Sequence, residues 1–457
     1  MIPETNLPKA KEGNYKILSL DGGGTWALLQ VLTLKKIFEK KDSEKIWKGH
    51  EILAHFDLVI ANSGGSMVLA ALACNWTFDK IEGLFTDPEI TSEIFDPLSF
   101  RDRYFPANFM KLIGIKNIGT RYSATSKIRA LKAILKVEGG RKLEHYFMDE
   151  LPALIGKPSL QIIVCTFDII NKRAKLFRSY KDSLARAEKV ANSNHFDRVN
   201  LVEAIHGSSN APVNYFDFPA IFSPANSKKR FYLWDGALGG FNNPVMAGLT
   251  EAMANGIRRS DIHVLSIGTA SKLVSEMDTR SFRDSYYSTI LGRNVKHKED
   301  GSIDFDKTIY AKTPFGKIKR PRLFNRTFRG SKLYGETISN LSQTILFEPQ
   351  SWATYSAFVH LFSNNLNASK NNKRFTRLSP QIINKENATQ IIKDLYKMDM
   401  DVSSAEEIKL LESCFDLWQK GDIINEPVQW VTTINDEYIF ARGHRTFKDA
   451  LKDLNWV

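Results

Sequence analysis

The sequence predicts an α/β protein with a mainly parallel central sheet, helices on both faces of that sheet, and a mostly helical C-terminal region. Short apolar runs typical of strands alternate with helical patterns through the first 270 residues, and small-residue turns end several strands. Beyond about residue 271 this alternation stops and helical patterns dominate. Strands that alternate with helices favour a parallel sheet, because each crossover helix returns the chain to the same edge.

The first 270 residues contain the clearest elements. The expected strands are apolar runs at 15–20, 56–61, 160–166, 174–178, 230–234 and 262–267. Apolar residues at helical spacing predict helices at 26–40, 66–86, 123–137, 144–154, 199–208 and 243–256. In the helix expected over 123–137 we expect the apolar face on the core and the basic residues, including Lys127 and Lys132, toward water.

We expect the whole chain to divide into four regions. We expect residues 1–13 to be a loose lead, 14–270 to form one α/β domain, and 271–332 to form a basic loop or lid. Residues 333–457 are expected to pack on that domain as a mainly helical region. Within it, helical patterns lie at 333–346, 351–364, 384–397 and 403–420, with a short strand at 375–378.

The composition is ordinary for a globular protein of enzyme size. The 457 residues are 43% hydrophobic and 25% charged, enough for a large core. The N-terminus has no apolar core of signal-peptide type, and no apolar run of about 18 residues predicts a transmembrane helix. Scattered Cys74, Cys165 and Cys414 favour a reducing, cytoplasmic compartment over a disulfide framework. Without Cys-x-x-Cys or His-Glu-x-x-His, we expect no metal and no cofactor.

Ser63 follows a strand pattern and precedes a helical one. The apolar run at 56–60 leads into Ala61-Asn62-Ser63-Gly64-Gly65, and residues 66–73 have helical character. A serine on such a tight strand-to-helix turn has the geometry of a nucleophile elbow, usually written Gly-x-Ser-x-Gly. Ala61 replaces the first glycine but remains small. Ser63 is therefore the candidate nucleophile.

Three consecutive glycines, Gly22, Gly23 and Gly24, lie between the first expected strand and a helical pattern. Such a turn directs several backbone N–H groups the same way and forms an anion site at a helix N-terminus. The anion is either a phosphate or the oxyanion of acyl transfer, and a plain tight turn is the remaining interpretation. The phosphate-binding motifs Gly-Lys-Ser/Thr and Gly-x-Gly-x-x-Gly are absent here.

Asp235 ends another expected strand, in the segment Phe231-Tyr232-Leu233-Trp234-Asp235-Gly236-Ala237. A carboxylate at a strand end of the same sheet can reach a serine hydroxyl and act as its general base. A solvated Asp-Gly turn is the alternative interpretation.

Together these segments resemble the motifs of the patatin-like phospholipase family. Members carry an Asp-Gly-Gly-Gly-x-Arg-Gly oxyanion loop, a Gly-x-Ser-x-Gly serine and an Asp-Gly-Gly/Ala motif, and the order and spacing match from Ile17 to about Ala270. The stretch 204–212 is similar to the family's Ser-Ser-x-Ala-Pro stretch, and 264–269 is similar to its Leu-Ser-x-Gly-Thr strand end.

The resemblance implies a three-layer patatin-like fold in which residues 14–270 form the catalytic domain. It implies a lipid acyl hydrolase of phospholipase A or lysophospholipase type, with Ser63 as nucleophile and Asp235 as base. The N–H groups of Gly22, Gly23 and Gly24 are then expected to stabilise the oxyanion. The substrate expected is a phospholipid or lysophospholipid, and the dyad requires no cofactor. The aromatic-rich segment 87–122 is expected to line the acyl pocket, act as a lid, or simply pack.

The chain departs from the family pattern at one informative position. Trp26 occupies the place of the family arginine, and Ala27 replaces the last glycine. This departure favours one alternative, a catalytically weakened lipid-binding or regulatory protein. A soluble esterase or thioesterase without a membrane step is a further alternative. A Ser-His-Asp triad is the rival mechanism, with His206 as its candidate histidine.

The net charge is +12, and one dense basic cluster lies within the expected lid. Its cations are Lys317, Lys319, Arg320, Arg322, Arg326 and Arg329. Cations with apolar neighbours suit an anionic membrane surface, and a solvated loop is the alternative interpretation. We expect a cytoplasmic protein, peripheral at membranes, that binds no nucleic acid. An activator or a homo-oligomer is compatible with the long C-terminal region.

Overall fold

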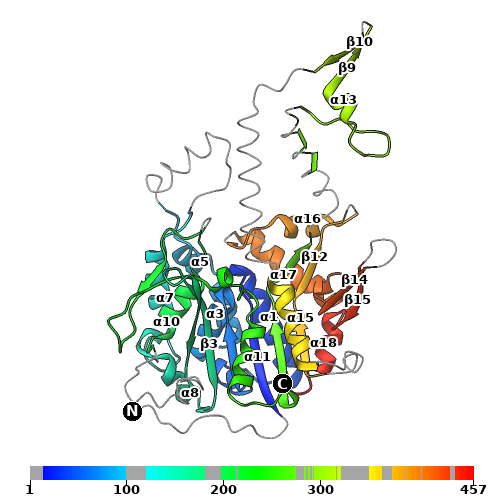
Figure 1. Cartoon of the computed structure of the whole chain (residues 1–457). Coiled ribbons are helices and arrows are strands. Elements are labelled where there is room, and N and C mark those ends of the chain that lie inside the picture. The colour runs from blue at the N-terminus through cyan, green and yellow to red at the C-terminus, as the bar shows by residue number, and fades with distance from the viewer. Residues whose placement is uncertain are drawn as a thin grey trace.

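We describe the protein from a computed structural model. It describes residues 14–98, 120–180, 197–212, 215–273, 283–284, 287–288, 291, 293–314, 316–320, 349–362, 373–385, 387–402, 404–432 and 438–457. A central sheet lies between two layers of helices (Figure 1). The predicted α/β class is therefore confirmed.

The central sheet has eight strands in the order β11-β7-β1-β2-β3-β6-β5, with β4 also paired to β3. Five strands pair in parallel: β1 (Tyr15–Leu20), β2 (Leu58–Ala61), β3 (Gln161–Asp168), β7 (Ile262–Ile267) and β11 (Phe375–Leu378). The remaining three, β4 (Arg173–Arg178), β5 (Ala220–Phe222) and β6 (Phe231–Asp235), make antiparallel pairs. The central strands are mostly buried and apolar, as expected for a sheet with helices on both faces.

Two apolar cores fill the space between the sheet and its helices. Leu18 and Val59 belong to one core, while the adjacent Ile17 and Leu58 belong to the other. Successive side chains of a strand point to opposite faces, which explains this division. The helices are α1 (Leu28–Lys41), α2 (Gly49–Ala54), α3 (Ser63–Ala73), α4 (Phe78–Thr86), α5 (Pro88–Ile94), α7 (Ala124–Ile134), α8 (Leu151–Leu154), α10 (Leu201–Ser208), α11 (Val245–Ala254), α15 (Pro349–Phe362), α16 (Gln390–Lys397), α17 (Ala405–Lys420) and α18 (Phe447–Asp453).

Two expected helices are interrupted in the structure. The helix predicted over 66–86 is divided into α3 and α4 by a turn in which Asn75 has a φ of 60°. The helix predicted over 144–154 is replaced by two 3₁₀ turns, Leu143–His145 and Met148–Glu150, followed by the short α8. The helix predicted over 333–346 lies outside the described residues.

The C-terminal region contributes directly to the sheets. Strand β11 lies beside β7 at one edge of the central sheet, so the sheet extends across the expected domain boundary at 270. A second sheet joins β8 (Ser271–Leu273), β12 (Pro380–Ile383) and β13 (Ile424–Asn425), and a third pairs β14 (Gln429–Thr432) with β15 (Tyr438–Arg442). Residues far downstream thereby reach the end of the sheet where the predicted motifs lie.

A small hairpin stands apart from the main body at the top of Figure 1. It consists of β9 (Tyr310–Thr313) and β10 (Gly316–Lys319), preceded by α13 (Phe305–Ile309). Part of the expected basic loop is therefore a β-hairpin. Within the described ranges, no helix has the length and apolar character needed to cross a membrane.

Candidate active site

Ser63 occupies a strained turn directly after β2 and begins α3. Its φ of 47° lies in the left-handed region, which residues other than glycine rarely adopt. The next residue must be small, because a Cβ on Gly64 would lie 2.4 Å from the carbonyl oxygen of Gly24. The elbow and the glycine loop are thus packed against each other.

The hydroxyl of Ser63 lies close enough to the Asp235 carboxylate to lower its pKa. Asp235 is 2% exposed, and its Oδ1 also accepts from Asn62 Nδ2 (3.0 Å) and from the backbone N–H of Ala237 (2.9 Å). Burial raises the pKa of Asp235, while these donors and the charge of Lys127 oppose the increase. The structure therefore places a buried base of increased basicity beside the candidate nucleophile.

Asp235 reaches Ser63 by a route that differs from the predicted one. We expected parallel strands to carry both residues to the same carboxyl edge of the sheet. Strand β6 instead pairs antiparallel to β3 and places Asp235 opposite Thr166. Since Ala61 of β2 pairs with Val164 of β3, Asp235 lies close to the level of Ser63.

The glycine loop joins β1 to the 3₁₀ turn Gly24–Ala27. Its conformation is fixed by Thr269, whose hydroxyl donates to the carbonyl of Gly22 (2.6 Å). The N–H of Gly22 donates to the carbonyl of Asn242 (2.7 Å), which corrects the expectation that Gly22 is an oxyanion donor. Within the part of the chain that the structure describes, no such bond occupies the N–H groups of Gly23 and Gly24.

A second group of polar residues supports the elbow. The N–H of Ser63 donates to Ser208 Oγ (2.8 Å), and the Ser208 hydroxyl donates to Asn62 Oδ1 (3.3 Å). Asn62 thus contacts both Ser208, which holds the serine turn, and the Asp235 carboxylate. The sequence pointed to neither role, although Asn62 adjoins the nucleophile and Ser208 lies in the Ser-Ser-x-Ala-Pro stretch.

His206 does not take part in this arrangement. Its side chain is 5% exposed and lies outside the lining of the cavity at Ser63. Burial lowers the pKa of His206 well below its usual value, and Lys127 acts in the same direction. The described residues that line the cavity at Ser63 include no histidine. Nor do these residues contain a group of His, Cys, Asp and Glu side chains suited to a metal ion.

A cavity of about 40 Å³ opens at Ser63. Its apolar walls include Met67, Ile94, Phe95, Phe216 and Met400. A water molecule needs roughly 10–15 Å³, so the cavity holds only a few atoms around the hydroxyl. Entry of an acyl chain requires the walls to move.

The comparisons with known proteins agree with the motifs. The model of the patatin-like phospholipase family matches residues 18–249, just over half of the chain. The chain belongs to the patatin-like phospholipase family. Family membership supports lipid acyl hydrolase activity in general terms. The crystal structure of VipD from Legionella pneumophila matches with a TM-score of 0.31 and 12% identity, covering 89% of this chain and 80% of that chain. None of the curated proteins matches the chain.

Trp26, at the position of the family arginine, binds a C-terminal segment in this patatin-like protein. Its indole N–H donates to the carbonyl of Asp399 (2.8 Å), and the N–H of Thr25 donates to the carbonyl of Met400 (3.0 Å). The segment 399–401 is held from the other side as well. Its carboxylates bind Arg121, Tyr122 and Tyr215. The C-terminal region thus closes one side of the patatin-like site.

Lys127 is buried in the wall of the same cavity, contrary to the expectation that it faces water. It is 1% exposed because α5 and α10 pack against α7. Its ammonium group lies 3.3 Å from both the His206 carbonyl and Ser209 Oγ. The helical spacing of apolar residues predicted α7 but did not show that α5 and α10 cover the face that carries Lys127.

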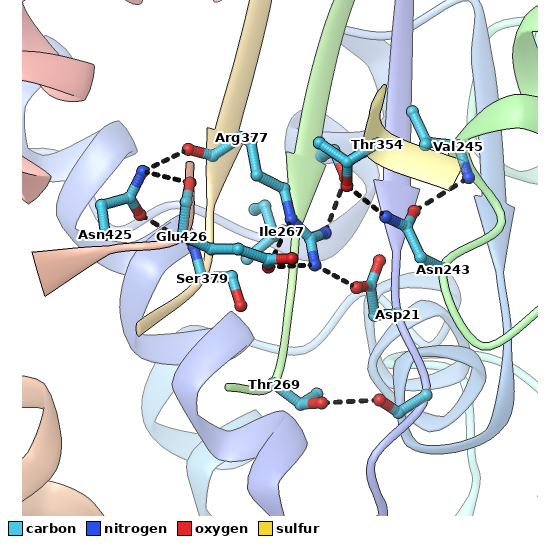
Figure 2. A network of polar contacts seen from close by, with 12 residues as sticks. Asp21, Asn243, Val245, Ile267, Thr269, Thr354, Arg377, Ser379, Asn425 and Glu426 are labelled. Carbon is cyan, nitrogen blue, oxygen red and sulfur yellow. Dashed lines mark hydrogen bonds and ion pairs between the residues drawn. The ribbon is translucent and has the colours of Figure 1, made fainter. Parts of the chain in front are cut away.

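An ionic network joins the patatin glycine loop to the C-terminal region (Figure 2). Arg377 of β11 contacts Asp21 (2.6 Å) and Glu426 (2.8 Å), and all three side chains are almost completely buried. Arg377 also donates to Ser266 Oγ (2.8 Å). Asp21 directly precedes Gly22, so this network anchors the start of the loop.

The predicted basic cluster is only partly described. Lys317 and Lys319 are exposed on β10 together with Ile318, which is 59% exposed. Lys317 pairs with Asp306 (2.7 Å), whereas Arg320 donates to the carbonyls of Lys307 and Tyr310. Arg322, Arg326 and Arg329 lie outside the described residues. The hairpin therefore presents at least two cations beside an apolar side chain.

Proposed function

We propose that this protein cleaves ester-linked fatty acids from phospholipids or lysophospholipids through a Ser63–Asp235 dyad and an acyl-enzyme. The closeness of the Ser63 hydroxyl to the buried Asp235 carboxylate, whose pKa the hydroxyl lowers, carries this proposal. The left-handed φ of Ser63 and its contact with the glycine loop support it, because both are typical of a nucleophile elbow.

The reaction begins when Ser63 Oγ attacks the ester carbonyl carbon and its proton passes to Asp235. The N–H groups of Gly23 and Gly24 stabilise the tetrahedral oxyanion, and losing one such donor typically costs about 3 kcal/mol of barrier. Collapse of the intermediate expels the alcohol, which takes the proton from Asp235. A water molecule then gives a proton to Asp235 and attacks the acyl-enzyme. When the fatty acid leaves, the Ser63 oxygen takes that proton from Asp235.

Action at an anionic membrane surface is part of the proposal. The exposed Lys317, Ile318 and Lys319 of the hairpin support it, because cations near anionic lipid contribute about 1 kcal/mol each. Charge reversal of Lys319 should weaken binding to anionic vesicles and leave hydrolysis of a monomeric ester unchanged. Equal vesicle binding by the variant would contradict the role of the hairpin.

Trp26 favours a second candidate, a catalytically weakened lipid-binding protein. Its indole is engaged with Asp399, so this position supplies no cation to the substrate. A protein of that kind should bind vesicles without releasing fatty acid. A soluble esterase should instead hydrolyse a short monomeric ester and gain nothing from a vesicle surface.

Fatty-acid release from vesicles of mixed anionic and neutral phospholipids tests the proposal. The wild type should release fatty acid, and Ser63→Ala should not. Ser92→Ala is the matched control, because Ser92 is an exposed serine of α5 and should leave the rate unchanged. Release by Ser63→Ala at the wild-type rate would contradict the proposed nucleophile.

A further inference from the structure

Lys127 is a buried cation that the proposed dyad does not use directly. Its Nζ contacts the His206 carbonyl and Ser209 Oγ, and it lies 3.9 Å from the centre of the Phe216 ring. None of these groups carries a charge. Within the described ranges, no carboxylate lies within 4.0 Å of Lys127 to form an ion pair.

Fold stability does not account for this lysine. An ammonium without a charged partner is expensive to bury, and a methionine of similar length would fill the same space without that penalty. Burial lowers the pKa of Lys127 well below its usual value, and the charge of Asp235 opposes the decrease. A buried charge retained at a cavity is a common mark of a binding function.

The surroundings of Lys127 suit an anionic ligand near Ser63. Lys127, Ser209 and Phe216 line the same cavity as Ser63, and Lys127 is the one cation among its described lining residues. Asp401, the carboxylate among them, pairs with Arg121 (2.7 Å). Trp26 supplies no charge at the family's arginine position because its indole binds Asp399. An anion in the cavity would give Lys127 the charged partner that the protein itself does not provide.

We propose that Lys127 binds the phosphodiester of the substrate beside the scissile ester and so selects phosphate-bearing lipids over neutral glycerides. This assignment rests on the proposed function, since it requires an ester lipid in the cavity. A charge-assisted hydrogen bond from the ammonium to a phosphate oxygen is the contact expected. Lys127 is then a specificity-determining residue.

A binding measurement tests the assignment without requiring turnover. Ser63→Ala is titrated with monomeric dihexanoyl phosphatidylglycerol, with dihexanoylglycerol and with inorganic phosphate, with and without Lys127→Met. The Kd for the phosphate lipid should rise about tenfold or more with Lys127→Met, because hydrogen bonds to charged groups are the stronger class. The Kd for the neutral lipid should change little, and the thermal midpoint should not fall.

Lys132→Met is the matched control on the same helix. Lys132 is partly exposed and pairs with Glu144 (3.3 Å), so its replacement should affect neither lipid. An equal change in both Kd values, or no change, would overturn the proposal. Binding of inorganic phosphate as tightly as the phosphate lipid would overturn the lipid assignment and leave a free-phosphate site.

The kinetic experiment separates this inference from the proposed function. If Ser63→Ala releases fatty acid as fast as the wild type, the proposed function fails, and the two lipid titrations still decide the role of Lys127. If hydrolysis depends on Ser63, Lys127→Met should lower kcat/KM for the phosphate lipid and spare the neutral one. Equal losses on both substrates would contradict a selective role.

Discussion

Asp21, at the start of the glycine loop, and Asp235, at the serine turn, are two carboxylates whose pKa is raised by burial, and they differ in their partners. Asp21 lies 2.6 Å from the guanidinium of Arg377, which also binds Glu426 (Figure 2). Asp235 accepts from the uncharged donors Asn62 and Ala237 and lies beside the Ser63 hydroxyl. A carboxylate paired with arginine suits the anchoring of a loop, whereas one bound by neutral groups keeps its ability to accept a proton.

This difference suggests how the protein separates stability from reactivity. The Arg377 network connects the glycine loop to β11 and to Glu426 in the C-terminal region. The proposed dyad of Ser63 and Asp235 has no cation within ion-pair distance among the described residues. Loss of the Arg377 cation should therefore destabilise the fold, whereas loss of the Asp235 charge should not.

The largest expected effect is on activity. Asp235→Asn should reduce kcat by about 10²–10⁴-fold, the usual contribution of a general base. Because burial raises the pKa of Asp235, its ionised form destabilises the fold as pH rises through that pKa, so the variant should melt no lower than the wild type at neutral pH. Burial raises the pKa of Asp21 as well, to about 7 even beside Arg377, so the same reasoning applies to Asp21→Asn. The prediction fails if Asp235→Asn melts at a lower temperature than the wild type.

Arg377→Met should cause the largest loss of stability. It leaves the buried Asp21 and Glu426 without their cation, and breaking a buried pair costs about 3–5 kcal/mol. Urea denaturation measures the loss. Lys35→Met is the surface control, since Lys35 is partly exposed where it pairs with Glu82 and should contribute at most about 1 kcal/mol. Equal losses for the two variants would show that the network does not stabilise the fold.

The pH dependence of hydrolysis should report Asp235. Its ionised form is the proton acceptor, so kcat/KM should fall as pH decreases through a pKa above the ordinary aspartate value of about 3.9. Asn62→Ala removes one donor to the carboxylate, which should raise that pKa and move the acid limb to higher pH. A limb that is unchanged in Asn62→Ala would contradict the assignment.

The smallest effect is expected at Trp26. Trp26→Phe removes the hydrogen bond to the Asp399 carbonyl, which typically contributes about 0.5–1.5 kcal/mol to the free energy of unfolding. Trp352→Phe is the control, because Trp352 is 69% exposed. Denaturant titration measures the free energy of unfolding of both variants. Only Trp26→Phe should lower it, and equal losses in the two variants would contradict a specific contact at Trp26.

Local motifs were sufficient to predict the α/β fold and the residues now found side by side at the site. Ser63, Asp235 and the glycine loop each follow a strand, and short sequence patterns reveal such turns. The antiparallel direction of β6 was not predictable in this way, because it depends on how the sheet is assembled. Gly22 was misassigned for a similar reason, since its N–H binds Asn242, far along the chain.

The contributions of the C-terminal region depend on contacts between distant segments. Trp26 and Asp399 are 373 residues apart, and neither shows a local pattern that indicates the other. Lys127 illustrates a second limit. Helical spacing predicted α7, but it could not show that α5 and α10 cover the face that carries this lysine.

The most direct test of the Ser63–Asp235 dyad is to locate the acyl-enzyme. The wild type, Ser63→Ala and Asp235→Asn are mixed with an activated ester of a fatty acid, quenched early, and mapped by peptide mass spectrometry. A single acyl adduct on Ser63 is predicted in the wild type, absent in Ser63→Ala and strongly reduced in Asp235→Asn. Acylation of another residue, or equal acylation of Ser63 in Asp235→Asn, would contradict the dyad.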